Sequence, residues 1–397
     1  MLRPDTVALT ALLALITALG PVSTDMYLPS LPDIGRLLSA SPAAVQLTLS
    51  AYLVGFAFGQ LGYGPMSDRF GRKPVLLAAL ALFCVGNLAC AAAPSIGLLI
   101  AARVVQAIGG SGAVVVARAV VRDLYSGARA GRELSLMGSI MAIAPIVAPL
   151  IGGVLQTEFG WRANFLVALA VGLTAALIVW RKLPETLARR ASEPVSPLGI
   201  ASTYRGLIAS PSFLAHLGIV STSFAGLFAW LSGSSFVLQD LYGLSAFAYS
   251  VAFAICSFGY LAGTFTAATV VSRLGLDKTI GIGTGALAGG GLALAAALAF
   301  GPPSLPAIVL PTTLYLFGLG LALPQGMAGA LTPFPDRAGA ASSLLGFVQQ
   351  SSAALLGVLV GHMLGTSAWP FGAPMAVMGC LSLLIWAVSR GARGARH

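Results

Sequence analysis

Residues 64–74 read GPMSDRFGRKP, and four of these eleven residues are charged. They separate two apolar stretches, at about 43–63 and 74–93, and each is close to the roughly 20 residues that a helix needs to cross a bilayer. Glycines allow tight turns, and Pro74 suits the first turn of a helix. The pattern predicts a short charged loop between two membrane-spanning helices.

Within this loop, Asp68 stands four residues before Arg72, which is within ion-pair range if the segment is helical. The alternative is a basic loop that only fixes the orientation of the chain in the membrane.

The same apolar pattern continues along the whole chain. The sequence is 57% hydrophobic and 9% charged, with a mean hydropathy of +0.91. Such a chain is suited to lipid, so we expect an all-α integral membrane protein. Twelve apolar windows are near span length, at about 6–27, 43–63, 74–93, 96–120, 134–157, 163–181, 211–233, 246–270, 279–300, 304–326, 338–362 and 371–389.

Residues 182–205 form the one long hydrophilic segment, and six of the twelve windows lie on either side of it. The sequence therefore predicts three parts. They are an N-terminal six-helix bundle over 1–181, a cytoplasmic linker over 182–205, and a C-terminal six-helix bundle over 206–397.

The two predicted bundles are related by a shift of 204 residues. The shift places Gly55-x-x-x-Gly59 on Gly259-x-x-x-Gly263, and Arg69-x-Gly71 on Arg273-x-Gly275. A parallel repeat of two bundles with a cavity between them at mid-membrane is the architecture of one class of secondary transporter.

The positive charges are distributed unevenly between the two sides of the membrane. With the N-terminus in the cytoplasm, nineteen of the 22 Lys and Arg fall in cytoplasmic segments. Arg36 and Arg162 fall outside, and Arg103 lies inside the fourth span. This bias predicts cytoplasmic termini, and it explains the net charge of +10 without a nucleic-acid partner. The four cysteines lie singly in apolar runs and indicate neither a disulfide framework nor a metal site.

Arg103 is expected to lie about 10 Å inside the outer face, at 1.5 Å per residue along the helix. A guanidinium at that depth is costly unless it faces a cavity, water or a carboxylate. The alternative is that its side chain reaches back to the outer interface.

The fifth span reads GSIMAIAPIVAPLIGGVL, with prolines at 145 and 149 and glycines at 138, 152 and 153. Neighbouring helices in a membrane can satisfy the backbone groups that prolines free, and glycines let helices approach closely. The alternative is a generic kinked packing helix.

These motifs together resemble a known family. The 64–74 loop closely resembles the signature loop of the major facilitator superfamily, and Arg103-x-x-Gln106-x-x-Gly109 resembles the fourth-helix motif of its proton-coupled members. Ala148-Pro149-x-x-Gly152-Gly153 resembles the motif of its drug exporters, although Ala148 replaces the usual first glycine. With TDMYLPSLP at 24–32, the chain is similar to the Bcr/CflA branch of drug:proton antiporters.

The resemblance implies two six-helix bundles around a central cavity that alternates its access across the bacterial inner membrane. It implies export of small amphiphilic antibiotics, phenicols among them, driven by the proton gradient. It also implies that two motifs govern the conformational change, with residues Gly64, Asp68, Arg69, Gly71, Arg72, Pro149, Gly152 and Gly153. In the second half, Ser272 replaces the aspartate, so a one-sided cytoplasmic latch is expected.

The residues alone indicate which energy source to expect for transport. Nothing in the sequence matches G-x-x-x-x-G-K-S/T, so direct use of ATP is not expected. An ion gradient needs a titratable group in the membrane, and Asp25 is the one carboxylate in the twelve windows that is not plainly in an external or cytoplasmic segment. We therefore expect Asp25 to carry the proton, with the Arg103 charge favouring the ionised carboxylate. No cofactor is expected.

The depth of Asp25 leaves an alternative open. Counted from residue 7, it lies about 27 Å along a span that must cross roughly 30 Å, so it could be the wet end of the helix. Pro29 and Pro32 suggest that the helix continues, kinked, beyond it. Asp33 would then be the ordinary wet end.

Aromatic and amide side chains in the spans are candidates for substrate contact, with lipid-facing or packing roles as the alternative. The candidates are Tyr27, Tyr52, Phe56, Phe224, Phe228 and Gln349. A proton-coupled metabolite transporter, for uptake or efflux, is the second hypothesis, but a hydrophilic metabolite usually requires more polar groups in the spans. A membrane enzyme would need clustered His, Asp, Glu or Cys, which the windows lack. We expect a monomer in the lipid bilayer that binds a small amphiphilic drug or metabolite and protons.

Overall fold

The structure is a computed structural model that describes residues 7–125, 127–187, 197–300, 304–334, 337–364 and 369–394. These residues are helical and contain no strand. The elements of the first half are α1 (Val7–Asp25), η1 (Leu28–Ser30), α2 (Leu31–Leu37), α3 (Pro42–Phe70), α4 (Arg72–Ala92), α5 (Ile96–Leu124), α6 (Gly127–Phe159) and α7 (Arg162–Lys182). The second half contains α8 (Pro197–Ile208), α9 (Pro211–Phe236), the π-helix η2 (Val237–Leu241), α10 (Ala246–Leu274), α11 (Leu276–Phe300), α12 (Leu305–Leu331), α13 (Ala338–Met363), α14 (Trp369–Val388) and α15 (Arg390–Gly394).

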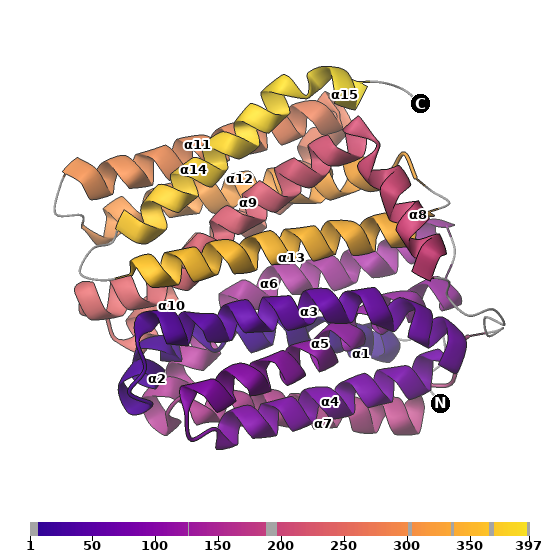
Figure 1. Ribbon diagram of the computed structural model, residues 1–397, viewed down its shortest axis with the longest axis horizontal. Coiled ribbons are helices and arrows are strands. Elements are labelled where there is room, and N and C mark those ends of the chain that lie inside the picture. The colour runs from indigo at the N-terminus through magenta and orange to yellow at the C-terminus, as the bar shows by residue number, and fades with distance from the viewer. Residues whose placement is uncertain are drawn as a thin grey trace. The chain divides into compact units, whose positions relative to one another are not determined.

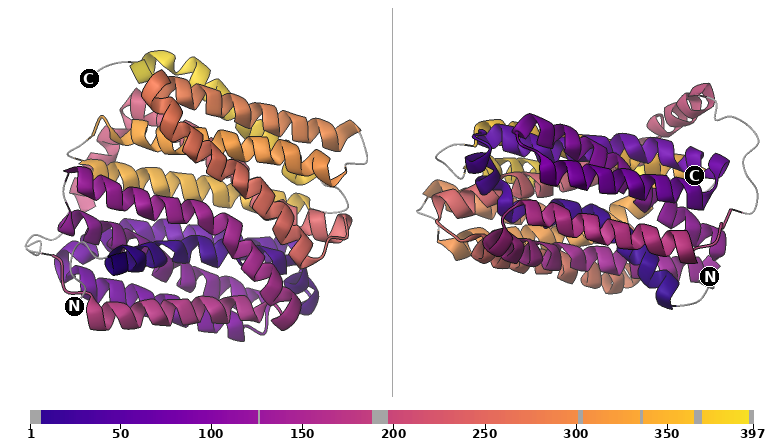
Figure 2. Two further views of the ribbon diagram at one scale, coloured as in Figure 1. Left: turned by 180° about the vertical axis from the view of Figure 1, so that it is seen from behind. Right: turned by 90° about the horizontal axis from the view of Figure 1, so that it is seen from below.

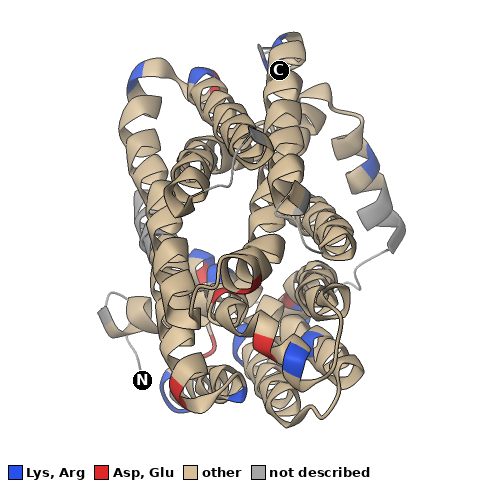
Figure 3. Ribbon diagram, turned by 90° about the vertical axis from the view of Figure 1, so that its left-hand side faces the viewer, with Lys and Arg blue, Asp and Glu red and all other residues tan. Residues whose placement is uncertain are grey.

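Twelve helical stretches in the described residues are long and apolar enough to cross a membrane, which confirms the twelve predicted spans. Figure 3 shows how few Lys, Arg, Asp and Glu interrupt the helices. The first stretch, Ala8–Leu37, is longer than the window predicted at 6–27 because α1, η1 and α2 follow one another in a single stretch.

Contacts between residues divide the chain into two compact units. The first unit comprises Met1–Ala40 and Ala51–Val195, and the second comprises Ser41–Ser50 and Ser196–His397. The division after residue 195 falls inside the linker predicted over 182–205, of which 188–196 lie outside the described residues. The start of α3 belongs to the second unit, where Gln46 Nε2 donates to Ser232 Oγ at 2.6 Å.

Each unit is a helical bundle when considered by itself (Figures 1 and 2). In the first unit, α4 packs against α5 and α7, and α1 packs against α5, α6 and α7. In the second unit, α11 packs against α12 and α14, while α9 packs against α12, α13 and α14.

The predicted repeat is confirmed by the helices themselves. Helices α3 and α10 start and end 204 residues apart. Gly55 and Gly59 of α3 face α5, and Gly259 and Gly263 of α10 face α12, in each case so closely that an added Cβ would overlap the neighbouring helix. Small residues that allow backbones to approach are the usual means of helix packing in membranes.

The charged segment 64–74 differs from the predicted loop. Helix α3 runs to Phe70 and α4 begins at Arg72, so Gly71 alone joins them. Gly71 has φ +104°, which a residue with a Cβ rarely adopts. Gly64 is therefore a helical residue with open space around it, and its predicted role as a turn glycine is wrong.

Close packing of α5 on α4 provides a test of this architecture. A Cβ at Gly109 would lie 2.7 Å from the Ala79 carbonyl oxygen, so Gly109→Val should destabilise the first unit by about 1–3 kcal/mol through overpacking. Thermal unfolding of the purified protein in detergent measures the effect. Gly97→Val, in the same helix but in open space, is the matched control. Equal melting temperatures for the two variants would contradict this packing.

Candidate functional site

The first membrane-spanning stretch is broken immediately after Asp25. Helix α1 ends there, and the chain passes through η1 into α2. Pro29 has no amide hydrogen to donate to the Asp25 carbonyl four residues earlier, which explains the break. The predicted continuation beyond Asp25 is confirmed, and Asp25 lies inside the Ala8–Leu37 stretch, twelve residues before its end.

The Asp25 side chain is only 6% exposed. Thr24 Oγ1 donates to Asp25 Oδ1 at 3.0 Å. No ion pair involves Asp25 in the part of the chain that the structure describes. Ionisable side chains in membrane-spanning segments are costly and belong by default to ion or proton pathways.

Arg103, at 0% exposed, is fully buried in the first unit. This burial excludes the alternative in which its side chain reaches back to the interface. Arg103 Nη1 donates to the Ser23 carbonyl at 2.9 Å and to Gln106 Oε1 at 2.6 Å. Gln106 in turn donates to Asn87 Oδ1 at 2.7 Å. The guanidinium is therefore held by a polar network that joins α1, α4 and α5.

Three aromatic rings surround the same guanidinium. Its central carbon lies 4.8 Å from the ring centroid of Tyr27, 4.3 Å from that of Tyr52 and 5.9 Å from that of Phe165. Cation–π contacts of this kind strengthen when they are desolvated. They compensate part of the cost of burying Arg103.

Arg103 does not act on Asp25 through an ion pair. It bonds to the carbonyl of Ser23 and packs on Tyr27, so it holds the main chain on both sides of Asp25. The direct action of the Arg103 charge on the carboxylate stays a prediction. What the structure shows is a shared segment, residues 23–27, which we call the helix break.

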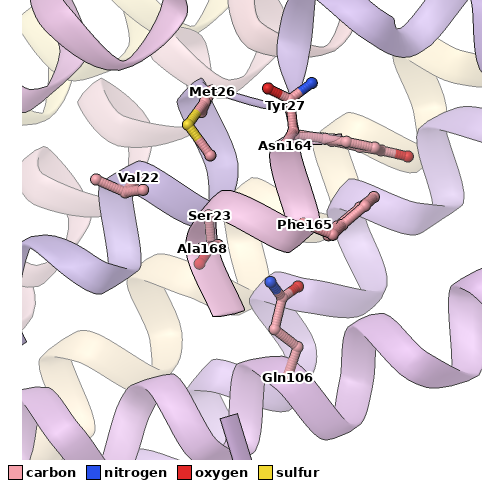
Figure 4. Close-up of a pocket in the computed structure, with 8 residues that line it drawn as sticks. All are labelled: Val22, Ser23, Met26, Tyr27, Gln106, Asn164, Phe165 and Ala168. Atoms are coloured by element: carbon pink, nitrogen blue, oxygen red, sulfur yellow. The ribbon is translucent and has the colours of Figure 1, made fainter. Parts of the chain in front are cut away.

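A narrow crevice adjoins the helix break (Figure 4). The crevice is too narrow to admit a water molecule. Its lining residues come from α1 and the helix break, α5 and α7, and they are Val22, Ser23, Met26, Tyr27, Gln106, Asn164, Phe165 and Ala168.

Helix α6 packs closely against the helix break. Gly152 packs against the Met26 carbonyl, and an added Cβ would overlap that oxygen. Pro149 and Gly153 are buried in the same helix. Gln156 donates to Asp33 of α2 one turn further along. The structure therefore gives Gly152 a specific neighbour beside Asp25, beyond the generic packing role considered from sequence.

The candidate substrate residues fall into two groups. In the first unit, Tyr27 and Tyr52 contact Arg103, and Phe56 lies 6.0 Å from Tyr52 between ring centroids. In the second unit, Phe228 is buried against Gly357 of α13, Gln349 of α13 is buried and Phe224 of α9 is half-buried. Substrate contact remains a prediction for all six.

The charged motif at the α3–α4 junction forms a compact ion-pair cluster in the first unit. Arg72 lies 2.5 Å from Asp68 between Nη1 and Oδ1, which confirms the ion pair expected from their spacing. Its Nε donates to Asp123 Oδ2 at 2.8 Å. Arg69 is exposed, with its guanidinium over Phe70, and forms no ion pair within the described part of the chain.

Two residues of this cluster were missed as sites. They are Asp123, at the end of α5, and Glu185, which follows α7. The Glu185 carboxylate accepts hydrogen bonds from the backbone amides of Arg72 at 2.9 Å and Lys73 at 3.2 Å. It therefore caps the start of α4. The Leu-Pro-Glu-Thr stretch directly after the sixth span was the available signal.

Comparison with known proteins places this geometry in context. Residues 13–357 match the family model described as Major Facilitator Superfamily. The chain is 32% identical to Multidrug resistance protein D of Escherichia coli, covering 97% of this chain and 96% of that protein. It is 32% identical to the Bicyclomycin resistance protein homolog of Haemophilus influenzae, covering 94% of each. It is 30% identical to the Chloramphenicol resistance protein of Pseudomonas aeruginosa, covering 99% of this chain and 93% of that one.

Solved structures share the fold. The crystal structure of a D-xylose-proton symporter superposes with a TM-score of 0.76 over 96% of each chain, at 17% identity. A bacterial homologue of the human lysosomal transporter Spinster superposes with a TM-score of 0.73, at 18% identity, over 99% of this chain and 98% of the other.

The contact between Gly152 and Met26 can be tested by adding one methyl group. Gly152→Ala should displace the helix break and reduce transport at least about tenfold, which corresponds to roughly 1.4 kcal/mol at the rate-limiting step. Transport is measured in proteoliposomes at matched protein levels. Gly289→Ala, an exposed glycine in open space on α11, should retain full activity. Wild-type transport by Gly152→Ala would show that this close approach is dispensable.

Proposed function

We propose that this chain, which belongs to the major facilitator superfamily and within it to the Bcr/CflA branch, exports small amphiphilic antibiotics in exchange for protons. Relatives named for resistance to multiple drugs, bicyclomycin and chloramphenicol support drug export, with phenicols in the substrate range. The family consists of transporters rather than enzymes.

The observation that carries the proton-coupling proposal is the position of Asp25. It is a buried carboxylate at a break within a membrane-spanning stretch. Within residues 23–27, Asp25 is the one carboxylate, and its Oδ1 accepts a hydrogen bond from the neutral Thr24 hydroxyl. Membrane-embedded carboxylates of this kind serve as proton carriers in secondary transporters.

The first unit suggests how a proton at Asp25 would act. The proton would bind the Asp25 carboxylate, whose Oδ1 lies 3.0 Å from the Thr24 hydroxyl. Gain or loss of that proton changes the charge of the helix break. Arg103 holds the same segment at Ser23, and Gly152 packs on it at Met26, so a shift there reaches α5 and α6 directly. Substrate and proton would then compete through one segment, as antiport requires.

The proposed protein lies in a membrane and draws its energy from an ion gradient. The positive-inside distribution of Lys and Arg supports cytoplasmic termini in the bacterial inner membrane. The proton gradient supplies the energy without a bound cofactor, and a monomer carries the whole transport path. A metabolite transporter is the less favoured reading because a hydrophilic metabolite usually requires more polar groups in the spans than this sequence has.

Neutralising Asp25 tests the coupling. Asp25→Asn should abolish drug-driven proton release from proteoliposomes and the resistance of cells that express the protein, because the amide cannot take up the proton. Resistance is measured against a panel that includes chloramphenicol, with and without an uncoupler. Asp33→Asn is the matched control, since Asp33 is paired with Arg36 in α2 and lies outside the helix break. Intact proton release by Asp25→Asn, or resistance of the wild type that persists with the uncoupler, would contradict proton coupling.

Replacing Arg103 tests the network around the break. Arg103→Lys keeps the positive charge but loses the planar guanidinium, which donates hydrogen bonds to Ser23 and Gln106. It also loses the stacking of that group on Tyr27 and Tyr52. Loss of about 2 kcal/mol of desolvated cation–π energy predicts a transport rate at least tenfold lower. Arg36→Lys, with a side chain 66% exposed, should transport normally. An Arg103→Lys variant as active as Arg36→Lys would show that only the charge is needed.

A further inference from the structure

The two units begin their third membrane-spanning helix in the same way. Gly71 precedes α4 with φ +104°, and Gly275 precedes α11 with φ +80°. These two positions are related by the 204-residue shift. In the first unit, Glu185, which follows α7, caps the start of α4. The position related to Glu185 by the same shift is Ser389, which follows α14.

The second unit also has a charged contact at this place, although its sequence lacks the aspartate of the first. Asp277 lies in the first turn of α11. Arg393, in the short helix α15, donates from Nε to Asp277 Oδ1 at 2.7 Å. The Arg393 side chain is only 2% exposed and also donates to Ser389. The arginine is therefore folded back against α11, away from solvent.

Trp386, near the end of α14, completes this contact. Its Nε1 donates to the Asp277 carbonyl at 3.1 Å, and the Arg393 guanidinium lies 5.6 Å from its ring centroid. The indole packs on Gly281, where an added Cβ would overlap it. The first two turns of α11 are thus fixed to the end of α14 and to α15 through four residues: Asp277, Gly281, Trp386 and Arg393. Figure 1 shows α15 at the end of α14.

We propose that Ser389–Gly394 is a clasp that fixes the start of α11 to the end of α14 and is required for transport. It does for the second unit what Glu185 does for the first, with the charges reversed. In the first unit an anion from the segment after the sixth span holds the third span. In the second unit a cation from the corresponding segment holds an anion on the third span. The second unit, where Ser272 stands in place of the aspartate, thus has a charged contact of its own at this place, built from different residues.

The requirement for transport follows from mechanics and electrostatics. Alternating access moves each bundle largely as a rigid body, so the ends of its helices have to stay together. The shielded Arg393 side chain makes three contacts at once, to Asp277, Ser389 and Trp386, and removing it loses all of them. Loss of Arg393 should therefore release the first turn of α11 and the end of the chain.

Chemical labelling tests whether the clasp exists, and it does not depend on the proposed function. The full-length protein is treated with phenylglyoxal, which modifies accessible arginines, and modification is read by mass spectrometry. Arg390, exposed on the same short helix, should react at least about tenfold faster than Arg393, whose side chain is shielded. Asp277→Asn should remove most of that protection and leave Arg390 unchanged. Equal reaction of Arg390 and Arg393 in the wild type would overturn the proposal.

Transport measurements test whether the clasp is required, and only this readout rests on the proposed function. Arg393→Gln should lower the maximal transport rate roughly fivefold or more with an unchanged KM, because no substrate contact is lost. Arg390→Gln is the matched control and should behave like the wild type. The charge-exchanged variant, Asp277→Arg with Arg393→Asp, should recover at least about half of the rate, including where Arg393→Gln fails to accumulate in the membrane. Equal transport by Arg393→Gln and Arg390→Gln, or no recovery in the exchanged variant, would overturn the requirement.

Discussion

The hydrogen bond from Arg103 to the Ser23 carbonyl is the constraint on which the candidate site depends. A bilayer offers no water to a free carbonyl or to a guanidinium, so each has to find its partner inside the protein. Here the two satisfy each other, with Gln106 and Asn87 extending the network. A helix interrupted at Asp25 is tolerated because α5 supplies a donor where the regular ladder is interrupted.

The packing of α6 follows from the same requirement. The interruption places the Met26 carbonyl beside α6. A glycine at 152 lets another helix contact the Met26 carbonyl directly. The residues around Asp25 are therefore held on both sides. Arg103 contacts Ser23 and Tyr27, and Gly152 packs against Met26.

Much of this arrangement could be predicted from sequence because its determinants are local. Span length and hydropathy predict twelve helices. The 204-residue repeat predicts matching glycine contacts, and the scarcity of carboxylates indicates Asp25. The tertiary contacts were not predictable in the same way. Glu185 meets α4 across more than a hundred residues of chain, and Arg393 meets Asp277 over a similar separation. Neither pairing has a local pattern, because each depends on where the end of one helix lies beside the start of another.

The boundary between α3 and α4 shows a different limit. Charge and glycine content predicted a loop over 64–74, whereas both helices extend through most of it. Asp68 and Arg72 bond across the junction only because this segment is almost entirely helical. Sequence composition identified the interacting pair correctly but misjudged the backbone that holds it.

The single-residue junction at Gly71 has a consequence for how force passes through the first unit. Loops of several residues have slack and let adjoining helices tilt independently. Here α3, of 29 residues, and α4, of 21 residues, are joined only by Gly71, which has two backbone torsion angles. The contacts of Glu185 and the ion pairs of Arg72 restrict both torsion angles. Helices α3 and α4 are therefore coupled: a displacement of one is expected to move the other, with little bending at Gly71.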